Sequence, residues 1–191
     1  MDRVRFLFRD SLAKVQRLIG LKVEPQRVLR HPLQYFSAPW TALKMLPRRC
    51  SGGPVTAHET QVDRLPNLRS WPEDGGPFVT LPIVYSEDVD HPGLNKSNIG
   101  MYRVQLLGNQ YETNQEIGLH YQLHRGIGVH HSRAIESGKP FHINIFVGGT
   151  PAMSVAAVMP LPEGMSELTI AGLLAGQRIE LSQGEHLPVY A

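Results

Sequence analysis

Two short segments, residues 98–105 and 118–126, hold most of the side chains in this chain that could do chemistry. They read Asn-Ile-Gly-Met-Tyr-Arg-Val-Gln and Gly-Leu-His-Tyr-Gln-Leu-His-Arg-Gly. Their guanidinium, imidazole and glycine N–H groups are of the kinds that bind phosphate and metals. Further along the chain, Glu167 is a lone carboxylate at the start of an apolar stretch. Asn98, His120 and Glu167 together offer oxygen and nitrogen ligands for a divalent cation such as Mn²⁺ or Mg²⁺.

Each of these three side chains also has a purely structural interpretation. Asn98 follows a turn-rich segment, residues 93–97, and is a candidate for an Asx turn. His120 lies in a strand-like run, where a histidine is usually a hydrogen-bonded core residue. Glu167 stands at a predicted helix start, where the helix dipole favours a carboxylate. Residue type and spacing alone therefore leave both interpretations open.

The two segments resemble those of the UbiD-type decarboxylases, which use prenylated FMN. The resemblance continues through residues 69–78 (Arg-Ser-Trp-Pro-Glu-Asp-Gly-Gly-Pro-Phe) and 158–167 (Val-Met-Pro-Leu-Pro-Glu-Gly-Met-Ser-Glu). It extends from about residue 46 to about residue 180, with the matching segments in the order that the family has.

The resemblance implies a role for each matching residue. Asn98, His120 and Glu167 would ligate the divalent cation, and a cofactor phosphate and water would complete six-fold coordination. Arg103 would be the catalytic arginine beside the flavin ring, where it forms a bidentate pair with the substrate carboxylate or with a glutamate; a salt bridge at a strand edge is its alternative. The positions that match the flavin and phosphate cradle are Met101, Tyr102, Arg103, His120, Tyr121, Gln122, Arg125 and Gly126. The positions that match main-chain ligands of a monovalent cation, K⁺, are Ala156, Ala157 and Met159.

The activity that the resemblance implies is the reversible, non-oxidative decarboxylation of an aromatic or α,β-unsaturated carboxylic acid. The small-molecule substrate could be a polyprenyl-hydroxybenzoate, a simple phenolic acid or a menaquinone precursor. The residues that would select among these acids are mostly not identifiable in the sequence.

Family members are far longer than this chain, and their proton-donating carboxylate follows the metal-binding glutamate at a distance that falls beyond Ala191. Three explanations stay open. The chain is a fragment, or one part of a split enzyme whose partner chain supplies the missing part, or a flavin- and metal-binding module without catalysis. The sequence gives no reason to assign the proton donor to Glu116, Glu136 or Glu163. We expect either a homo-oligomer or such a partner chain.

Composition indicates a globular protein. The chain has 191 residues, of which 41% are apolar and 19% charged, and its net charge is +2. This small charge gives no indication of nucleic-acid binding. The apolar runs are too short for membrane insertion. The single cysteine, Cys50, excludes an intrachain disulfide and fits the reducing cytoplasm.

The remaining histidines invite a second metal site. His130 and His131 are adjacent, so on a strand they would point to opposite faces. With His142, we interpret them as surface or structural residues.

Residues 1–54 are predicted to form an N-terminal helix (3–21) and a proline-rich connector with a short helix at 41–45. Residues 55–191 are predicted to form the second domain, with a helix that Ser166 caps and Gly176 ends. A second short helix is expected to begin or end within 132–137. The expected strands are 55–60, 78–85, 101–107, 118–122, 141–147 and 154–158. The polar segment 109–116 is expected to be a hairpin loop.

The predicted fold class is therefore α+β with mostly antiparallel strands. The resemblance adds that the strands form a split β-barrel of the flavin-binding kind.

Overall fold

The computed structural model describes residues 38–161 and 165–190, together with isolated positions before residue 38. Most of the predicted N-terminal helix, residues 3–21, lies outside the described residues, as does Glu163. Two of the isolated positions, Phe8 and Val15, are buried in the main hydrophobic core.

A three-stranded antiparallel sheet occupies the centre of the molecule, in the order β3–β2–β6. Its strands are β2 (Pro82–Ser86), β3 (Asn98–Met101) and β6 (Ile143–Val147). All five residues of β2 are buried, so both faces of this strand are covered. Alternate side chains of a strand point to opposite faces, and β2 accordingly contributes to two separate clusters.

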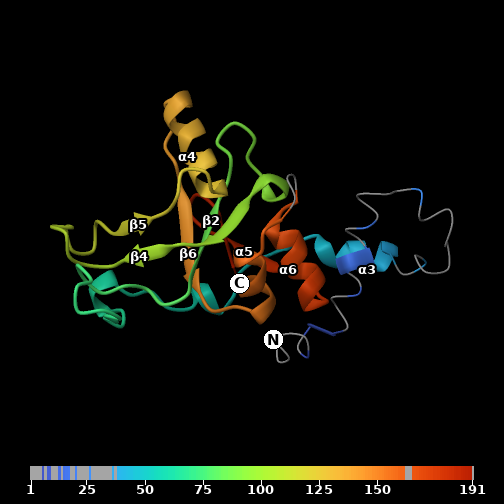
Figure 1. Cartoon of the computed structure of the whole chain (residues 1–191), viewed down its shortest axis with the longest axis horizontal. Helices are drawn as coiled ribbons and strands as arrows, with labels where there is room; N and C mark the ends of the chain where they lie inside the picture. The colour runs from blue at the N-terminus through green and yellow to red at the C-terminus, as the bar shows by residue number, and fades with distance from the viewer. Residues whose placement is uncertain are drawn as a thin grey trace.

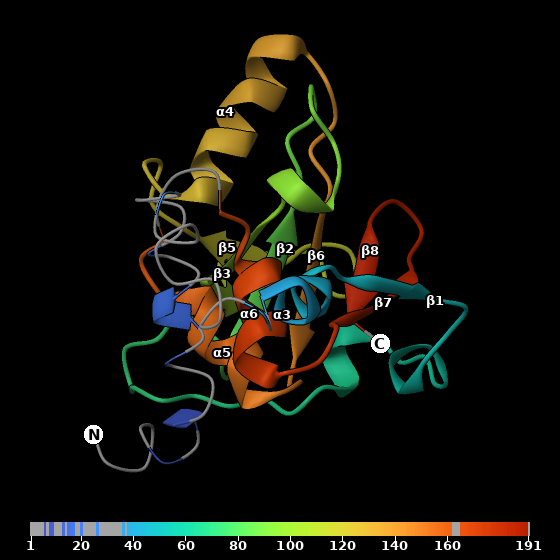
Figure 2. The same ribbon diagram turned by 90° about the vertical axis from the view of Figure 1, so that its right-hand side faces the viewer.

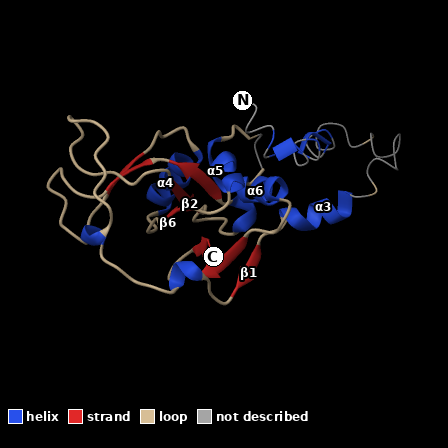
Figure 3. Cartoon of the chain, turned by 90° about the horizontal axis from the view of Figure 1, so that it is seen from below, coloured by secondary structure: helices blue, strands red, loops and turns tan. Residues whose placement is uncertain are grey.

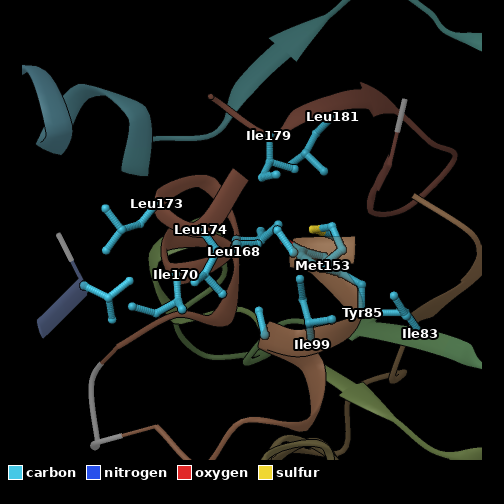
Figure 4. Close-up of a cluster of buried hydrophobic side chains, with 14 of the residues drawn as sticks. Ile83, Tyr85, Ile99, Met153, Leu168, Ile170, Leu173, Leu174, Ile179 and Leu181 are labelled. Carbon is cyan, nitrogen blue, oxygen red and sulfur yellow. The ribbon is translucent and has the colours of Figure 1, made fainter. Parts of the chain in front are cut away.

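Helices cover one face of the central sheet. α5 (Pro151–Val158) and α6 (Glu167–Ala175) pack on each other and on β3, and α3 (Ala38–Met45) packs on α6. The main core contains Ile83 and Tyr85 of β2, Ile99 of β3, Met153 of α5, and the apolar side of α6 (Figure 4). The α6 residues in this core are Leu168, Ile170, Ala171, Leu173 and Leu174.

The other face of β2 is covered by a hairpin and a helix. The hairpin consists of β4 (Arg103–Gln105) and β5 (Gly118–His120), and the helix is α4 (Gly126–Ser137). Val84, Val104 and Ile127 form the second buried cluster here. The hairpin extends to one side of the central sheet and α3 lies on the opposite side (Figure 1). α4 stands at one end of the molecule (Figure 2).

The C-terminal strands form a further small sheet. β1 (Arg48–Cys50) pairs in parallel with β7 (Glu180–Gln183), which pairs antiparallel with β8 (Pro188–Tyr190). Figure 3 shows β1 beside the C-terminal end of the chain. Three short 3₁₀ helices complete the described part, at Pro54–Thr56, Val62–Arg64 and Leu94–Lys96.

The predicted fold class is confirmed: helices and mostly antiparallel strands make up the described residues. These strands form three separate small sheets, and no closed barrel joins them in the described part of the chain. No described helix is long and apolar enough to cross a membrane.

Two expected strands are wrong. Residues 55–60 contain a 3₁₀ turn, and residues 154–158 are the last five residues of α5. Pro151 occupies the first turn of this helix and alanines follow it, which favours a helix over a strand. The expected strand 78–85 begins only at Pro82. Before it, Leu81 has a φ of 51°, and Phe78 makes a single bridge to Gln105.

Two helix predictions have clear outcomes. α6 begins after Ser166 and ends at Gly176, which has a left-handed φ of 69°, as predicted. The Oγ of Ser166 forms no capping hydrogen bond and has no partner among the described residues.

The helix expected around 132–137 is the last part of α4, whose first turn holds Gly126 and Gly128. Gly128 is required there, because a Cβ would lie 2.3 Å from the carbonyl oxygen of Leu123.

Candidate functional site

A cavity of about 770 Å³ lies where the central sheet, the β4–β5 hairpin and the ends of three helices meet. Every predicted ligand of the divalent cation and every predicted cofactor-binding residue lines it. These residues are Asn98, Met101, Tyr102, Arg103, His120, Tyr121, Gln122, Arg125, Gly126 and Glu167. Residues that are far apart in the sequence thus come together, although their roles stay predictions.

Asn98 is the first residue of β3 and lies against the start of α4. A Cβ on Gly126 would lie 2.0 Å from Oδ1 of Asn98, so the glycine makes room for the amide. The Nδ2 group of Asn98 donates a long hydrogen bond of 3.5 Å to the hydroxyl of Tyr102. Its Oδ1 accepts no hydrogen bond from the described residues. This oxygen is therefore available as a ligand.

The N-terminus of α4 adds an anion-binding element to the same wall of the cavity. Its capping position, Arg125, makes no side-chain cap to the helix. The first N–H groups of a helix have no partner within the helix, and the dipole favours negative charge there. The guanidinium of Arg125 reaches Oε1 of Gln122 at 3.5 Å. A phosphate group fits this combination.

Glu167 is the first residue of α6 and is largely buried. Its Oε2 accepts a hydrogen bond from the N–H of Ile99 at 3.2 Å. Burial raises the pKa of Glu167, and the backbone hydrogen bonds to the carboxylate partly offset this effect. No cationic side chain pairs with it among the described residues. A buried carboxylate without a counter-charge is costly, and a bound cation would compensate it.

His120 ends β5 and is exposed toward the cavity. Its ring lies edge-on to Phe78, with the ring centroids 6.0 Å apart. The structure shows no cluster of three or more His, Cys, Asp or Glu side chains suited to a metal within its described part. A metal in this cavity would therefore need the amide of Asn98, together with oxygens from a bound ligand.

Arg103 lies directly opposite His120 in the β4–β5 hairpin. Its Nη2 donates to Oδ1 of Asp74 at 2.9 Å. The guanidinium carbon lies 4.1 Å from the centroid of the Phe78 ring. Arg103 thus forms a salt bridge with Asp74, as its purely structural interpretation predicts. The sequence does not indicate Asp74 or Phe78 as a contact of Arg103, although both belong to segment 69–78, which carries part of the resemblance.

Aromatic side chains form another part of the wall. Tyr102 and Tyr121 meet edge to face, with centroids 6.4 Å apart. The ring of Tyr102 lies so close to Gly100 that a Cβ there would be 2.4 Å from it. The hydroxyl of Tyr121 hydrogen-bonds to Nδ1 of His131, and burial raises the pKa of this tyrosine.

The end of α5 also reaches the cavity. Ala157 and Met159 line it, whereas Ala156 is fully buried and is not part of its wall. The N–H of Met159 donates to the carbonyl of Ala156 at 3.3 Å. The carbonyls at the end of a helix carry partial negative charge, as the predicted K⁺ site requires.

Comparison with known proteins identifies the family. Residues 48–191 match the family model UbiD, described as the 3-octaprenyl-4-hydroxybenzoate carboxy-lyase Rift-related domain. The chain belongs to the UbiD family. This confirms the resemblance seen in the sequence, and the family is one of decarboxylases.

Curated relatives are much longer than this chain. A protein of Chlamydia pneumoniae named as a subunit of 4-hydroxybenzoate decarboxylase is 41% identical over 125 residues, which are 65% of this chain and 20% of the relative. An uncharacterized protein of Archaeoglobus fulgidus is 34% identical over 126 residues, 65% of this chain and 24% of the relative. The chain thus spans about a fifth of the length of the curated relatives it matches.

Solved structures of the family share the fold. An evolved dimeric form of the UbiD-class enzyme HmfF from Pelotomaculum thermopropionicum, in complex with prFMN, has a TM-score of 0.65 at 25% identity. The match covers 79% of this chain and 37% of that enzyme. Vanillic acid decarboxylase of Sedimentibacter hydroxybenzoicus has a TM-score of 0.64 at 21% identity over 81% of this chain and 34% of its own.

Proposed function

We propose that this chain forms the flavin- and metal-binding part of a UbiD-type decarboxylase. The reaction would be the reversible, non-oxidative removal of CO₂ from an aromatic or α,β-unsaturated carboxylic acid, in the cytoplasm. One observation carries this proposal: a single cavity gathers the amide, imidazole, carboxylate and guanidinium groups from β3, β4, β5, α4 and α6. Prenylated FMN would supply the conjugated ring system that accepts electron density when CO₂ leaves.

Asn98, His120 and Glu167 would hold Mn²⁺ or Mg²⁺ through an amide oxygen, an imidazole nitrogen and a carboxylate oxygen. Three protein ligands leave such a cation under-coordinated. A phosphate oxygen of the cofactor, bound at the N-terminus of α4, would provide a further ligand. The Oδ1 of Asn98, which has no hydrogen-bond partner among the described residues, and the largely buried carboxylate of Glu167 support this arrangement. Carbonyl groups at the end of α5 would hold K⁺.

The cofactor would lie along the remaining residues of the cavity. Met101, Tyr102, Tyr121 and Gln122 would contact the flavin, and Arg125 and Gly126 would contact its phosphate. Tyr102 and Tyr121 present an edge-to-face pair of aromatic rings in this part of the wall, which suits contact with a flat aromatic ligand.

Arg103 would bind the substrate carboxylate through its planar fork of N–H donors. Glu167 is the one carboxylate among the described residues that line the cavity, and the metal would use it. We therefore propose that the proton donor lies outside residues 1–191, on a further segment or on a partner chain. One relative is named as a subunit of a decarboxylase, which supports an enzyme built from more than one chain. A homo-oligomer is the alternative assembly.

The test is purification of the chain, reconstitution with prenylated FMN, and then absorbance spectroscopy and metal analysis. We expect a bound flavin chromophore with stoichiometric Mn²⁺, and weaker retention of both in Glu167→Gln. Ser132→Ala, an exposed change on α4, is the matched control and should alter neither. Stoichiometric metal in the Glu167 variant would refute its role as a ligand.

A second candidate function is a binding module that holds flavin and metal without chemistry of its own. The observation that favours it is the lack of a second carboxylate among the described cavity residues. CO₂ release by the reconstituted protein, alone or with a partner, distinguishes the two.

A further inference from the structure

Arg103 stands at the boundary between two cavities. The smaller cavity, of about 330 Å³, lies beside the larger one and shares Met101, Tyr102 and Arg103 with it. Asp74 and Phe78, the two contacts of the Arg103 guanidinium, line only the smaller cavity. The two contacts that orient this guanidinium therefore come from the segment before β2. Neither comes from a residue that lines the larger cavity.

The carboxylate of Asp74 is fixed by its own turn. The backbone N–H of Asp74 donates a hydrogen bond to the carbonyl of Trp71 at 3.1 Å, and Oδ2 of Asp74 accepts a hydrogen bond from the N–H of Trp71 at 3.2 Å. The side chain is only 10% exposed. A short local loop of this kind holds a carboxylate in one orientation, because both its backbone and its side chain are bonded to the same residue.

Phe78 is fixed as well. Its N–H donates to the carbonyl of Leu68 at 2.9 Å, and it forms a bridge with Gln105, two residues after Arg103. The Phe78 ring is therefore held beside strand β4. A guanidinium that lies 4.1 Å from the centre of such a ring gains a cation–π contact and a flat surface to lie on.

These two contacts leave most of the guanidinium free. A guanidinium has five N–H donors in a fixed plane, and the Arg103 side chain gives Asp74 a single hydrogen bond from Nη2. The other donors of Arg103 have no protein partner among the described residues, and the side chain is 60% exposed. The remaining edge is therefore available for bidentate binding of a carboxylate.

We propose that Asp74 is a positioning residue, which holds the Arg103 guanidinium flat on Phe78 so that its free edge is presented to a ligand carboxylate. This inference rests on the proposed role of Arg103 in substrate binding. Asp74 does not touch the carboxylate; it acts through the orientation of Arg103. Bidentate recognition depends on that orientation, whereas a loosely held arginine attracts an anion only as a charge.

The first measurement is ¹⁵N NMR of the arginine side chains in the full chain, with the Arg103 signal assigned by its loss in Arg103→Lys. In the wild type, we expect slow rotation of the Arg103 guanidinium, and in Asp74→Asn, fast rotation. The matched control is Glu73→Gln, which removes the same charge from the neighbouring, exposed position. It should leave the rotation slow. Equal rotation in the wild type and in Asp74→Asn would overturn the proposal.

The second measurement is the affinity of the same proteins for benzoate, by titration calorimetry. Asp74→Asn should weaken binding about tenfold, because a guanidinium that is no longer held in place would make one charge-assisted hydrogen bond to the carboxylate in place of two. Glu73→Gln should leave the affinity unchanged. Equal binding by a folded Asp74→Asn protein would mean that Asp74 does not position Arg103 for the ligand, and tighter binding would mean that Asp74 competes with the ligand; either result would overturn the proposal. A wild-type protein that shows slow rotation but no benzoate affinity would instead refute the substrate-binding role of Arg103, and the orientation by Asp74 would stand.

Discussion

The contact between Gly126 and Asn98 shows how the candidate site depends on single atoms. A methyl group at position 126 would occupy the place of the Asn98 amide oxygen, at 2.0 Å. The same oxygen is the proposed metal ligand. A glycine is thus needed here for space, and the helix itself would tolerate alanine.

We predict that Gly126→Ala weakens metal binding but leaves the stability of the fold nearly unchanged. Alanine is favoured over glycine in helices by about 1 kcal/mol, so the free energy of unfolding should fall little or even rise. The displaced Asn98 side chain should lower the affinity for Mn²⁺ at least about tenfold, because one ligand is lost. Thermal unfolding and Mn²⁺ titration in the presence of FMN measure the two effects.

Gly52→Ala is the control for this change. A Cβ there would be 3.7 Å from the Thr56 hydroxyl, which is an ordinary contact. Undiminished Mn²⁺ binding by Gly126→Ala would show that Asn98 is not a ligand.

The buried side chain of His130 should make the free energy of unfolding depend on pH. It is buried, its Nδ1 is 3.0 Å from the hydroxyl of Ser86, and burial lowers its pKa below the usual value of 6.5, against the attraction of Asp88. The unfolded chain then binds more protons than the folded protein between the lowered pKa and 6.5. This contribution to stability is full above the unfolded pKa and is lost as the pH falls.

We therefore expect wild-type protein to lose more stability than His130→Gln between about pH 7.5 and about pH 5.5, by at most about 1.4 kcal/mol per pH unit. Urea unfolding at the two pH values gives the difference between the proteins. Asp88, Glu87 and Arg133 face His130 in both proteins, so their titration largely cancels. Parallel pH profiles would show that the folded protein does not hold His130 neutral.

At the scale of elements, α4 matters because its first turn belongs to the cavity. Polar pairs hold the rest of this helix to the segment after β2. Arg133 pairs with Asp88, whose side chain is 2% exposed, and Lys139, just after the helix, pairs with Asp90 at 2.8 Å in a much more exposed position. Burial differs sharply between these two pairs.

We predict that Arg133→Ala costs about 1–3 kcal/mol of stability, because it leaves a buried carboxylate with one partner fewer. Lys139→Ala should cost less than about 1 kcal/mol, the usual value for an exposed pair. Hydrogen exchange should show faster opening of α4 in the first variant only. Equal costs for the two changes would mean that the burial of Asp88 does not matter.

Helices with strong end signals were predictable from the sequence, and elements fixed by distant contacts were not. Ser166 and Gly176 mark the two ends of α6, and the structure confirms both positions, although the hydroxyl of Ser166 makes no capping hydrogen bond. β1, with three residues in a proline-rich region, exists because it pairs with β7, more than a hundred residues later. No local pattern encodes such a pairing.

In the candidate site, too, some residues could be predicted from the sequence, whereas contacts between distant segments could not. The side chains around the larger cavity were found through the family resemblance, since residue types alone left structural interpretations open for Asn98, His120 and Glu167. The resemblance included Asp74 and Phe78, but gave no role to either. Their contacts with Arg103 depend on how segment 69–78 folds beside β4, which the sequence did not indicate.

At the scale of the whole molecule, the length of the relatives is the main fact. The chain corresponds to about a fifth of the curated relatives it matches, so most of a full-length family member lies outside residues 1–191. The division of this chain at residue 54 stays a prediction. So does the assembly, whether with a partner chain or with further copies.

In the proposed function, the proton donor is a group that this chain does not supply. We expect residues 1–191, loaded with prenylated FMN and Mn²⁺, to show no measurable turnover. General acid catalysis contributes about 10²–10⁴-fold, so a missing donor costs roughly 3–5 kcal/mol of barrier. Adding a polypeptide with the remaining part of a curated relative should restore CO₂ release and exchange of substrate hydrogen for deuterium. The same mixture made with Arg103→Lys should stay inactive, because lysine cannot form the bidentate contact. Turnover by residues 1–191 alone, at a rate unaffected by the added polypeptide, would mean that a carboxylate within the chain donates the proton.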